Sequence, residues 1–158
     1  MRQKVLYVLK GSGNIFVKFV QYGCIYHCVT TYGVSCVTCD GKSMEPAIYH
    51  GDAYIVECIS VRRQKLKRGD IVGVKSMDDP NKYICKRIVA MGGDKVYNDI
   101  SNERVWVPKG HVWLEGDNKS SSHDSRYYGP VPYGLIFCRL IFRIWSGHQH
   151  KVHMSKDR

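Results

Sequence analysis

After residue 40, the hydrophobic and polar positions of the chain alternate with a period of two, which is typical of β-strands. The alternating segments are short, rich in β-branched and aromatic residues, and bounded by Gly, Asp, Asn or Pro. They comprise residues 53–59, 70–76, 82–91, 104–108, 111–116 and 135–145. No helical pattern separates them, so parallel β–α–β units are not expected. We predict an all-β domain of mainly antiparallel sheets over residues 39–146, followed by a polar tail over residues 147–158.

An uncharged run precedes this domain. From Phe19 to Cys39 there are 21 positions without Asp, Glu, Lys or Arg. A helix spans a bilayer with roughly 20 residues. We therefore predict an N-terminal segment, residues 1–38, that anchors the protein through one transmembrane helix at about residues 19–39. The run is poor in leucine and contains polar residues, so a cleavable presequence, an interfacial helix and a buried helix remain alternatives.

Charge and cysteine content narrow the choice of partners. The 158 residues carry a net charge of +10, which is compatible with nucleic-acid binding. The basic residues are scattered, however, and no known nucleic-acid-binding pattern accompanies them. We expect no nucleic-acid partner, because attraction to an anionic membrane surface explains the charge equally well. A CxxC occurs at residues 36–39, but no second pair follows at a metal-binding spacing, and we expect no metal ion.

The stretch CDGKSMEPAIYHGD, residues 39–52, contains the first candidate for chemistry, Ser43. Gly41 and Pro46 are turn residues, so an ordinary surface turn explains the segment without any function for the serine. If Ser43 is a nucleophile it needs a base, because a serine hydroxyl reacts poorly at neutral pH. The histidines outside the uncharged run and the tail are His50, His111 and His123. None of them has an identifiable partner that would complete a Ser-His-Asp triad.

Lys86 is a second candidate for the base. In the segment YICKRIVAM, strand alternation places Ile84, Lys86 and Ile88 on one face. If the isoleucines face the core, Lys86 is buried with them, and burial lowers the pKa of an amine because it removes the hydration of the ammonium. A neutral lysine can act as the general base of a Ser-Lys dyad. In the opposite orientation, Lys86 is solvated and Arg87 points inward.

Three motifs taken together resemble, in order, the conserved boxes of the type I signal peptidases. They are Ser-Met-x-Pro at 43–46, Lys-Arg-x-x-Ala-x-x-Gly-Asp at 86–94, and Gly-Asp-Asn-x-x-x-Ser-x-Asp-Ser-Arg at 116–126. The sequence RGDIV at 68–72 matches a further box between the first two. The resemblance covers about residues 39–145 and implies the partly open barrel of this family.

The resemblance also implies a role for each matched residue. Ser43 attacks the scissile carbonyl and forms an acyl-enzyme, and unprotonated Lys86 takes its proton and later activates water. Ser122 orients the Lys86 amine, while Asp124 and Arg126 hold the last motif in place. The backbone N–H of Ser43 donates to the oxyanion. No metal or organic cofactor is required.

Two further positions shape the expected site. By resemblance, Met44 and the residues near Ile48 and Ile84 form walls of shallow substrate pockets. Many bacterial relatives carry a serine two residues before the nucleophile, where its hydroxyl completes the oxyanion hole, but this chain has Gly41. Either the hole lacks one side-chain donor, or a backbone amide or water replaces it.

The closing sequence DSRYYGPVPYGLI and the small size are most similar to the mitochondrial members of the family. That similarity implies attachment to the mitochondrial inner membrane, with the catalytic domain facing the intermembrane space. It also implies a heterodimer with a related subunit 2, and precursor proteins with sorting presequences as substrates. Two other classes remain alternatives: a self-cleaving repressor-type Ser-Lys protease, and a non-catalytic membrane-anchored binding subunit.

Overall fold

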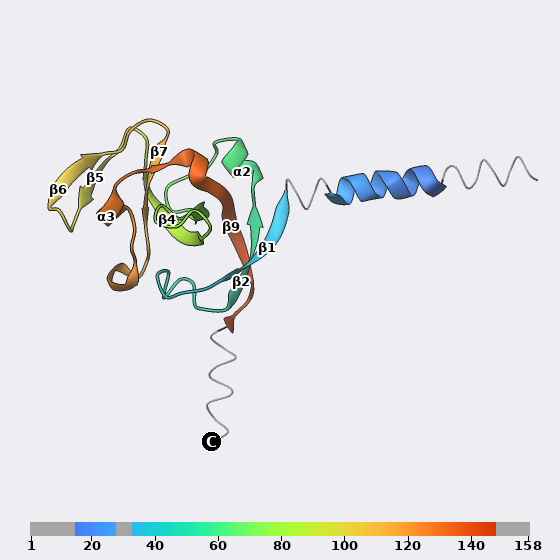
Figure 1. The fold of residues 1–158 in the computed structure, drawn as a ribbon, viewed down its shortest axis with the longest axis horizontal. Helices are drawn as coiled ribbons and strands as arrows, with labels where there is room; N and C mark the ends of the chain where they lie inside the picture. Colours follow the sequence, from blue (N-terminus) through green and yellow to red (C-terminus); the bar gives the residue numbers. More distant parts are fainter. Residues whose placement is uncertain (1–14, 28–32, 148–158) are drawn as a thin grey trace, which may run out of the picture. The chain divides into compact units, whose positions relative to one another are not determined.

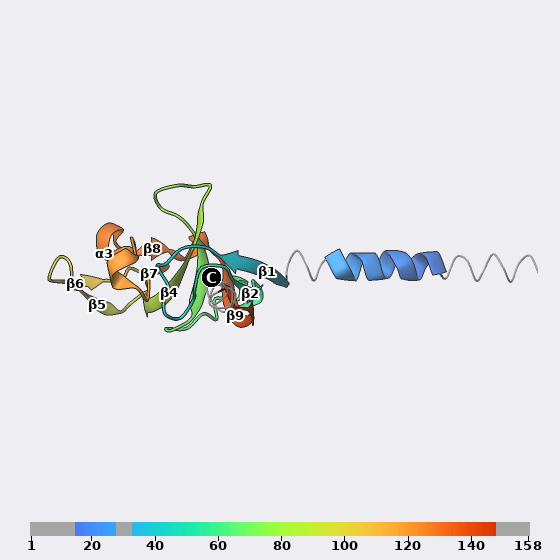
Figure 2. The same cartoon turned by 90° about the horizontal axis from the view of Figure 1, so that it is seen from below.

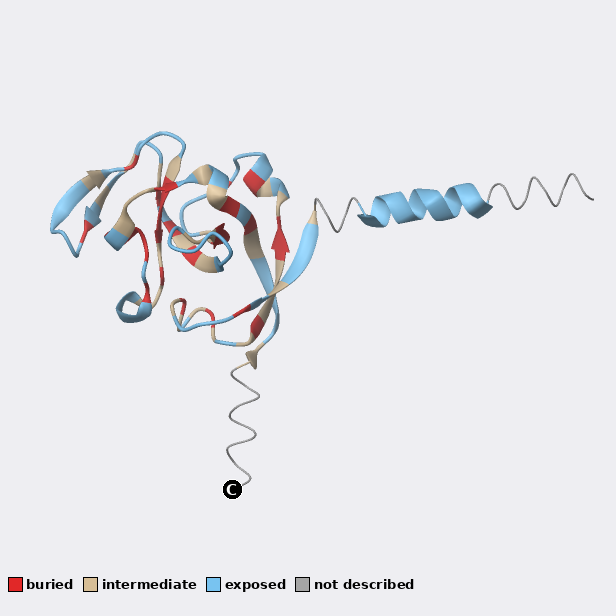
Figure 3. Ribbon diagram, viewed as in Figure 1, coloured by how far each residue is buried: buried red, intermediate tan, exposed pale blue. Residues whose placement is uncertain are grey.

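The computed structural model describes residues 15–27 and 33–147. The chain divides into two compact units, Met1–Val34 and Ser35–Arg158. In the first unit, residues 15–27 form a helix whose side chains are all exposed (Figure 3). The predicted polar tail lies outside the described residues, except for Gly147.

The predicted helix at about residues 19–39 does not extend to Cys39, and residues 28–32 of it lie outside the described residues. Val34–Cys39 forms strand β1, which lies next to β2 in a sheet. The absence of charge does not distinguish a helix from a strand, and the sequence VSCVTC contains β-branched residues that suit a strand. Among residues 15–27 and 33–147, no helix is both long enough and apolar enough to cross a bilayer.

The second unit is built mainly from two sheets (Figure 1). The strands are β1 (Val34–Cys39), β2 (Asp52–Glu57), β3 (Ile71–Lys75), β4 (Tyr83–Met91), β5 (Lys95–Asn98), β6 (Glu103–Trp106), β7 (His111–Glu115), β8 (Val131–Pro132) and β9 (Ile136–Trp145). A seven-stranded sheet has the order β1-β2-β9-β3-β4-β7-β8, and β5 pairs with β6 in a separate ribbon. The pairings that involve β2 to β9 are antiparallel.

Short helical turns connect some of the strands. They are α2 (Ile59–Arg62), η1 (Lys119–Ser121), α3 (Ser125–Tyr128) and η2 (Tyr133–Leu135). All six segments predicted as strands from the alternation are strands, with small shifts at their ends. The prediction of a mainly antiparallel β domain is therefore confirmed. The short strands β1, β5 and β8 were not predicted.

The seven-stranded sheet is curled (Figures 1 and 2). Three strands separate β1 from β4 in the sheet, which in a flat sheet would place them about 19 Å apart. Nevertheless, Sγ of Cys39 at the end of β1 lies 3.7 Å from Sγ of Cys85 in β4. The edge strands β1 and β8 do not pair with each other, so the sheet forms a half-barrel that stays open.

Strand β4 has apolar side chains packed on both faces. Ile88 is fully buried in the largest core cluster, and Ile84 packs against the same cluster. Cys85, which alternation places on the other face, packs against a second cluster. That second cluster is formed by Cys39, Met44 and Ile48. Because the face of β4 that carries Ile84 and Ile88 is covered by the core, a charged side chain on that face is held in an apolar setting.

Candidate active site

Lys86 is the charged residue that β4 carries into this setting. Its side chain is only 3% exposed, on the same face as Ile84 and Ile88, as the alternation predicts. Burial lowers the pKa of Lys86, and the positive charge of Arg126 acts in the same direction. The negative charge of Asp124 opposes this shift without reversing it. The fold thus favours a neutral amine at this position more than water does.

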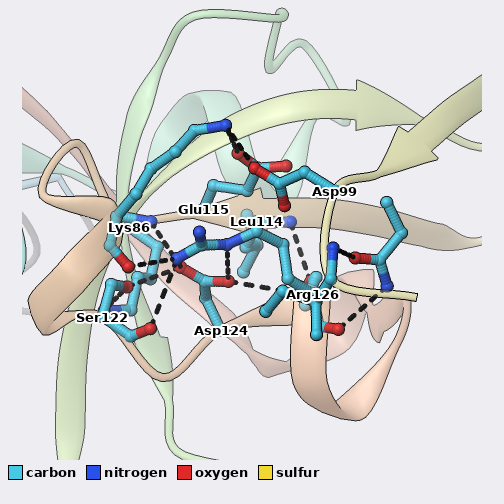
Figure 4. Close-up of polar contacts among 12 residues, drawn as sticks. Lys86, Asp99, Leu114, Glu115, Ser122, Asp124 and Arg126 are labelled. Carbon is cyan, nitrogen blue, oxygen red and sulfur yellow. Dashed lines mark hydrogen bonds and ion pairs between the residues drawn. The ribbon is translucent and has the colours of Figure 1, made fainter. Parts of the chain in front are cut away.

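A chain of hydrogen bonds extends from Lys86 into the loop after β7 (Figure 4). Nζ of Lys86 donates to Oγ of Ser122 at 2.9 Å, and Ser122 donates to Oδ2 of Asp124 at 2.6 Å. The carboxylate of Asp124 also accepts the Gly116 N–H at 3.0 Å. The Ser122 hydroxyl donates its one proton to Asp124. The oxygen of Ser122 therefore accepts from Lys86 and orients the lysine amine.

Asp124 and Arg126 form a buried ion pair beside Ser122. Nε of Arg126 donates to Oδ1 of Asp124 at 2.8 Å, and the second contact, from Nη2 to Oδ2, is 3.0 Å. Burial alone would raise the pKa of Asp124, but hydrogen bonds from Arg126, Gly116 and Ser122 together hold it below its ordinary value. Arg126 also donates to the carbonyl of Lys119 at 2.9 Å, which fixes the loop that carries Ser122.

Ser43 lies in the loop between β1 and β2, and its backbone reaches the same region. The Ser43 carbonyl accepts a hydrogen bond from the N–H of Asn118 at 3.0 Å. A Cβ placed on Gly116 would lie 2.4 Å from this carbonyl oxygen and 2.3 Å from Oγ of Ser122. The backbone of Ser43 and the hydroxyl of Ser122 therefore approach each other across a glycine that has no room for a side chain.

The side-chain hydroxyl of Ser43 has no hydrogen-bond partner among the described residues, and the recorded partner of the Lys86 amine is Ser122. The structure thus brings the Ser43 backbone, Ser122 and Lys86 into one neighbourhood. The loop around Ser43 is closed by the N–H of Gly51, which donates to the Cys39 carbonyl at 2.9 Å. The buried side chains of Met44 and Ile48, which are 3% and 2% exposed, anchor the loop to the second core cluster.

The pocket-wall role expected of Met44 and of the residues near Ile48 and Ile84 stays a prediction, and the structure adds a supporting role for Met44 and Ile48. Both side chains belong to the second core cluster, so they support the Ser43 loop from inside and present little surface to a ligand. Ile84 packs against the largest cluster. Gly41 has φ of +106°, a conformation that L side chains rarely adopt, and the space where its Cβ would lie is open. Backbone conformation, not crowding, requires glycine there.

A second bridge joins β4 to the last motif through Arg87, which sequence reasoning left without a partner. Its guanidinium makes two parallel contacts with the carboxylate of Asp117, at 2.7 and 2.6 Å, and donates to the Gly69 carbonyl at 2.8 Å. Asp117 directly precedes Asn118, which holds the Ser43 carbonyl. The two neighbouring basic residues of β4 therefore contact two different parts of one loop.

The signal peptidase family, described as peptidase S26, matches residues 12–107 and 97–145 of this chain. The chain belongs to this family. It is therefore a peptidase of the serine type, and the resemblance carried by the three motifs is confirmed.

Two named relatives refine this placement. The mitochondrial inner membrane protease subunit 1 of Mus musculus is 50% identical over 130 residues, which cover 80% of this chain and 78% of the relative. The corresponding subunit 2 of Mus musculus is 37% identical over 119 residues, covering 71% and 68%. Among solved structures, a signal peptidase I from Enterococcus faecalis aligns at 21% identity with a TM-score of 0.41, covering 49% of this chain and 97% of that one. The chain is thus similar to both subunits and shares more identical residues with subunit 1.

The three histidines weighed as bases contact groups other than Ser43 and Lys86. His50 accepts from the Gly41 N–H at 3.4 Å, His111 contacts the carbonyl of Lys109, and His123 stacks on Tyr127. Within the described part of the chain, none of the three forms a hydrogen bond or ion pair with Ser43 or Lys86. No group of three or more His, Cys, Asp or Glu side chains in residues 15–27 and 33–147 is arranged to hold a metal ion.

A shallow cleft with a volume of about 600 Å³ lies between the Ser43 loop and the last motif. Its lining comes from that loop and from the last motif: Glu45, Pro46, Tyr49, Asp117, Asn118, Lys119 and Ser120. The spacing of motifs along the sequence could not have predicted this cleft, because it depends on two loops meeting in space.

Proposed function

We propose that this peptidase removes sorting presequences from precursor proteins at the mitochondrial inner membrane, on the side of the intermembrane space, with Ser43 as nucleophile and Lys86 as general base. The observation that carries the proposal is the buried Lys86 amine, which donates to Ser122 beside the backbone of Ser43. A buried amine next to a serine loop has the composition required for a Ser-Lys dyad.

The reaction begins with attack of Ser43 Oγ on the scissile carbonyl carbon, while its proton moves to Nζ of Lys86. The backbone N–H of Ser43 donates to the resulting oxyanion. When the tetrahedral intermediate collapses, Lys86 returns the proton to the leaving amine, and Ser43 holds the presequence side as an ester. Lys86 then takes a proton from water, the hydroxide attacks the ester, and the serine leaves protonated.

The neighbours of Lys86 support this division of labour. A neutral amine has two N–H groups and one lone pair, and one N–H is used to donate to Ser122 at 2.9 Å. The lone pair then remains for the proton of Ser43. Asp124 acts as a positioning residue through Ser122, and the bidentate contact with Arg126 keeps its carboxylate in place.

Substrate binding is proposed along the open part of the half-barrel. An extended presequence adds backbone hydrogen bonds to an exposed strand, and small side chains near the cut fit a shallow surface. The cleft beside Glu45 and Asn118 is suited to the residues on one side of the scissile bond, because it adjoins the Ser43 loop.

The location and partner rest on the named relatives. The subunit 1 and subunit 2 proteins of Mus musculus are both named as mitochondrial inner membrane proteases, and both are similar to this chain. We therefore assign the chain to the subunit 1 role, with a related subunit 2 as its heterodimer partner. Precursor proteins delivered to that membrane are its substrates.

A serine-reactive penem or lipopeptide probe tests the proposal on the purified full-length chain. We expect one covalent adduct, located at Ser43 by mass spectrometry, and loss of cleavage of a presequence peptide in proportion to labelling. Ser101→Ala is the matched control, because Ser101 is exposed in the turn between β5 and β6 and does not line the cleft. Absence of any adduct, or an adduct on another residue with cleavage unaffected by Ser43→Ala, would favour a non-catalytic binding subunit.

A further inference from the structure

Two free thiols lie directly beside the proposed dyad. Sγ of Cys39 and Sγ of Cys85 are 3.7 Å apart, although 46 positions separate them along the chain. Cys85 immediately precedes Lys86 on β4, and Cys39 ends β1 four residues before Ser43. In the described part of the chain, no other pair of cysteine sulfurs is within hydrogen-bonding distance.

The two thiols differ in their readiness to react. The hydrogen bond between them lowers the pKa of Cys85, with burial opposing the shift and the charge of Lys86 supporting it. The same hydrogen bond and burial raise the pKa of Cys39. Either sulfur can donate in this contact; Cys85 is the one whose pKa is lowered, so it more readily becomes a thiolate. Because the thiolate is the nucleophilic form, Cys85 is the expected first site of oxidation.

We propose that a peroxide converts Cys39 and Cys85 into a reversible disulfide and that this disulfide switches the peptidase off. The switching step rests on the function proposed above. The Cys85 thiolate attacks one peroxide oxygen and becomes a sulfenic acid, releasing hydroxide that is protonated to water. The Cys39 sulfur then attacks the Cys85 sulfur and expels a second water. In total, two thiols and one hydrogen peroxide give one disulfide and two waters.

The geometry explains why activity should fall. A disulfide bond is about 2.05 Å long, so the two sulfur atoms must approach each other by about 1.7 Å from their separation of 3.7 Å. The carbonyl of Cys39 holds the Ser43 loop closed through Gly51, and Cys85 is paired with Gly73 inside the sheet. Movement at either cysteine is passed to a residue of the dyad.

The two cysteines are not equally free to move. Cys85 lies in β4, between β3 and β7 in the sheet, whereas Cys39 ends the edge strand β1. The edge strand is expected to give way, and the Ser43 loop moves with it. A misplacement of 1 Å in an active site can cost about 100-fold in rate, so we expect a loss of that order.

The test measures cleavage of a presequence peptide by the full-length chain, first reduced, then treated with hydrogen peroxide, then treated with dithiothreitol. We expect activity to fall about 100-fold with peroxide and to return with dithiothreitol. Recovery of activity with dithiothreitol also distinguishes the disulfide from methionine oxidation, which dithiothreitol does not reverse. Mass spectrometry should find a peptide in which Cys39 and Cys85 are joined, lighter by two hydrogens.

Two substitutions sharpen the test. Cys39→Ala and Cys85→Ala should each make cleavage insensitive to the peroxide–dithiothreitol cycle. Cys36→Ala should stay fully sensitive, because Cys36 lies on the same strand as Cys39 but is exposed and has no sulfur neighbour in the described part of the chain.

The possible failures can be told apart. If reversible inactivation persists in Cys39→Ala, or if the joined peptide forms while the enzyme stays fully active, the switch is wrong although the peptidase assignment stands. If the alanine variants do not fold, the wild-type protein decides, because inactivation without the joined peptide excludes this disulfide. If the reduced wild-type chain cleaves no presequence peptide, the proposed function fails and the switch fails with it.

Discussion

The amine of Lys86 donates to Oγ of Ser122 at 2.9 Å, and the proton of that same hydroxyl is committed to Asp124 at 2.6 Å. This order of donors orients the lysine from one side only. The amine is not neutralised by a carboxylate in direct contact, as in an ordinary ion pair, because the hydroxyl stands between Lys86 and Asp124. Burial can therefore lower the pKa of the lysine, whereas a direct carboxylate partner would raise it.

The first prediction concerns the dyad as a unit. Ser43→Ala and Lys86→Ala should each reduce kcat by at least about 10⁴-fold, and the double variant should be no slower than either single one. Two groups that act in the same proton transfer lose the same step when either is removed. Single-turnover cleavage of a presequence peptide measures the effect, with circular dichroism as the folding control. An active Lys86→Ala variant with an inactive His50→Ala variant would assign the base to histidine.

The second prediction concerns pH. If Lys86 is the general base proposed above, it must be neutral to accept the proton of Ser43, and burial lowers its pKa. The value of kcat/KM should therefore be low at acidic pH, rise as pH passes through this lowered pKa, and level off before the ordinary lysine value of about 10.4. Lys86→Arg should be inactive throughout, because guanidinium keeps its proton. A rate that stays flat from mildly acidic to alkaline pH would contradict an amine base.

The lowered pKa of Lys86 also makes the stability of the folded protein depend on pH. The folded state binds the lysine proton less tightly than the unfolded state, so the free energy of unfolding should increase as pH rises from the lowered pKa toward the ordinary one. Lys86→Met fills a similar volume without a charge and should raise the melting temperature below that range while removing activity. Thermal unfolding of both proteins at several pH values measures this difference, which should shrink as the lysine of the wild type becomes neutral.

The third prediction concerns Gly116, which lies between the Ser43 carbonyl and the Ser122 hydroxyl. In Gly116→Ala, the added Cβ would meet the Ser43 carbonyl and the Ser122 hydroxyl at 2.4 and 2.3 Å, so the two loops must separate. A displacement near 1 Å should lower kcat about 100-fold. Gly134→Ala is the matched control, because the space around Gly134 is open and its φ is not positive. Equal activity of the two variants would mean that the two loops can separate without cost.

Features that depend on neighbouring residues in the sequence could be predicted, whereas contacts between distant segments could not. The alternation of Ile84, Lys86 and Ile88 predicts the face of β4 on which the lysine lies, because a strand has a fixed period of two. Strand β1 was missed because its uncharged residues were assigned to the predicted helix, and β8 was missed because two residues carry no periodicity. The Arg87–Asp117 pair was missed because it depends on how β4 and the last motif meet in space.

The fourth prediction separates buried from exposed ion pairs. Asp124→Asn leaves the guanidinium of Arg126 buried without a negative partner, which should lower the free energy of unfolding by about 3–5 kcal/mol. It should also lower kcat, because the amide has one acceptor oxygen where the carboxylate uses two, so the contacts with Ser122 and Arg126 cannot all be kept. The control is Asp99→Asn, which breaks an exposed ion pair with Lys119 in the same region and should leave both quantities nearly unchanged. Chemical denaturation and peptide cleavage of the two variants give the comparison.

The last prediction concerns Gly41, where many bacterial relatives carry the serine whose hydroxyl completes the oxyanion hole. If this chain simply lacked a donor, Gly41→Ser should raise turnover, since one donor is worth about 100- to 1000-fold in related mechanisms. The backbone argues for the other possibility: φ of +106° at Gly41 strains any L side chain, although no atom stands within 4 Å of the position of its Cβ. The N–H of Gly41 also points to Nδ1 of His50, at 3.4 Å, so a change of φ would rotate this contact away.

We therefore expect no gain from Gly41→Ser. Gly41→Val should lose kcat with little change in KM, because the β-branched side chain resists positive φ most strongly. Gly41→Asn is the informative control, since asparagine tolerates positive φ better than valine and should retain more activity. A clear rise in kcat for Gly41→Ser that still requires Ser43 would show that the oxyanion hole was short of a donor, and it would make the conformational explanation wrong.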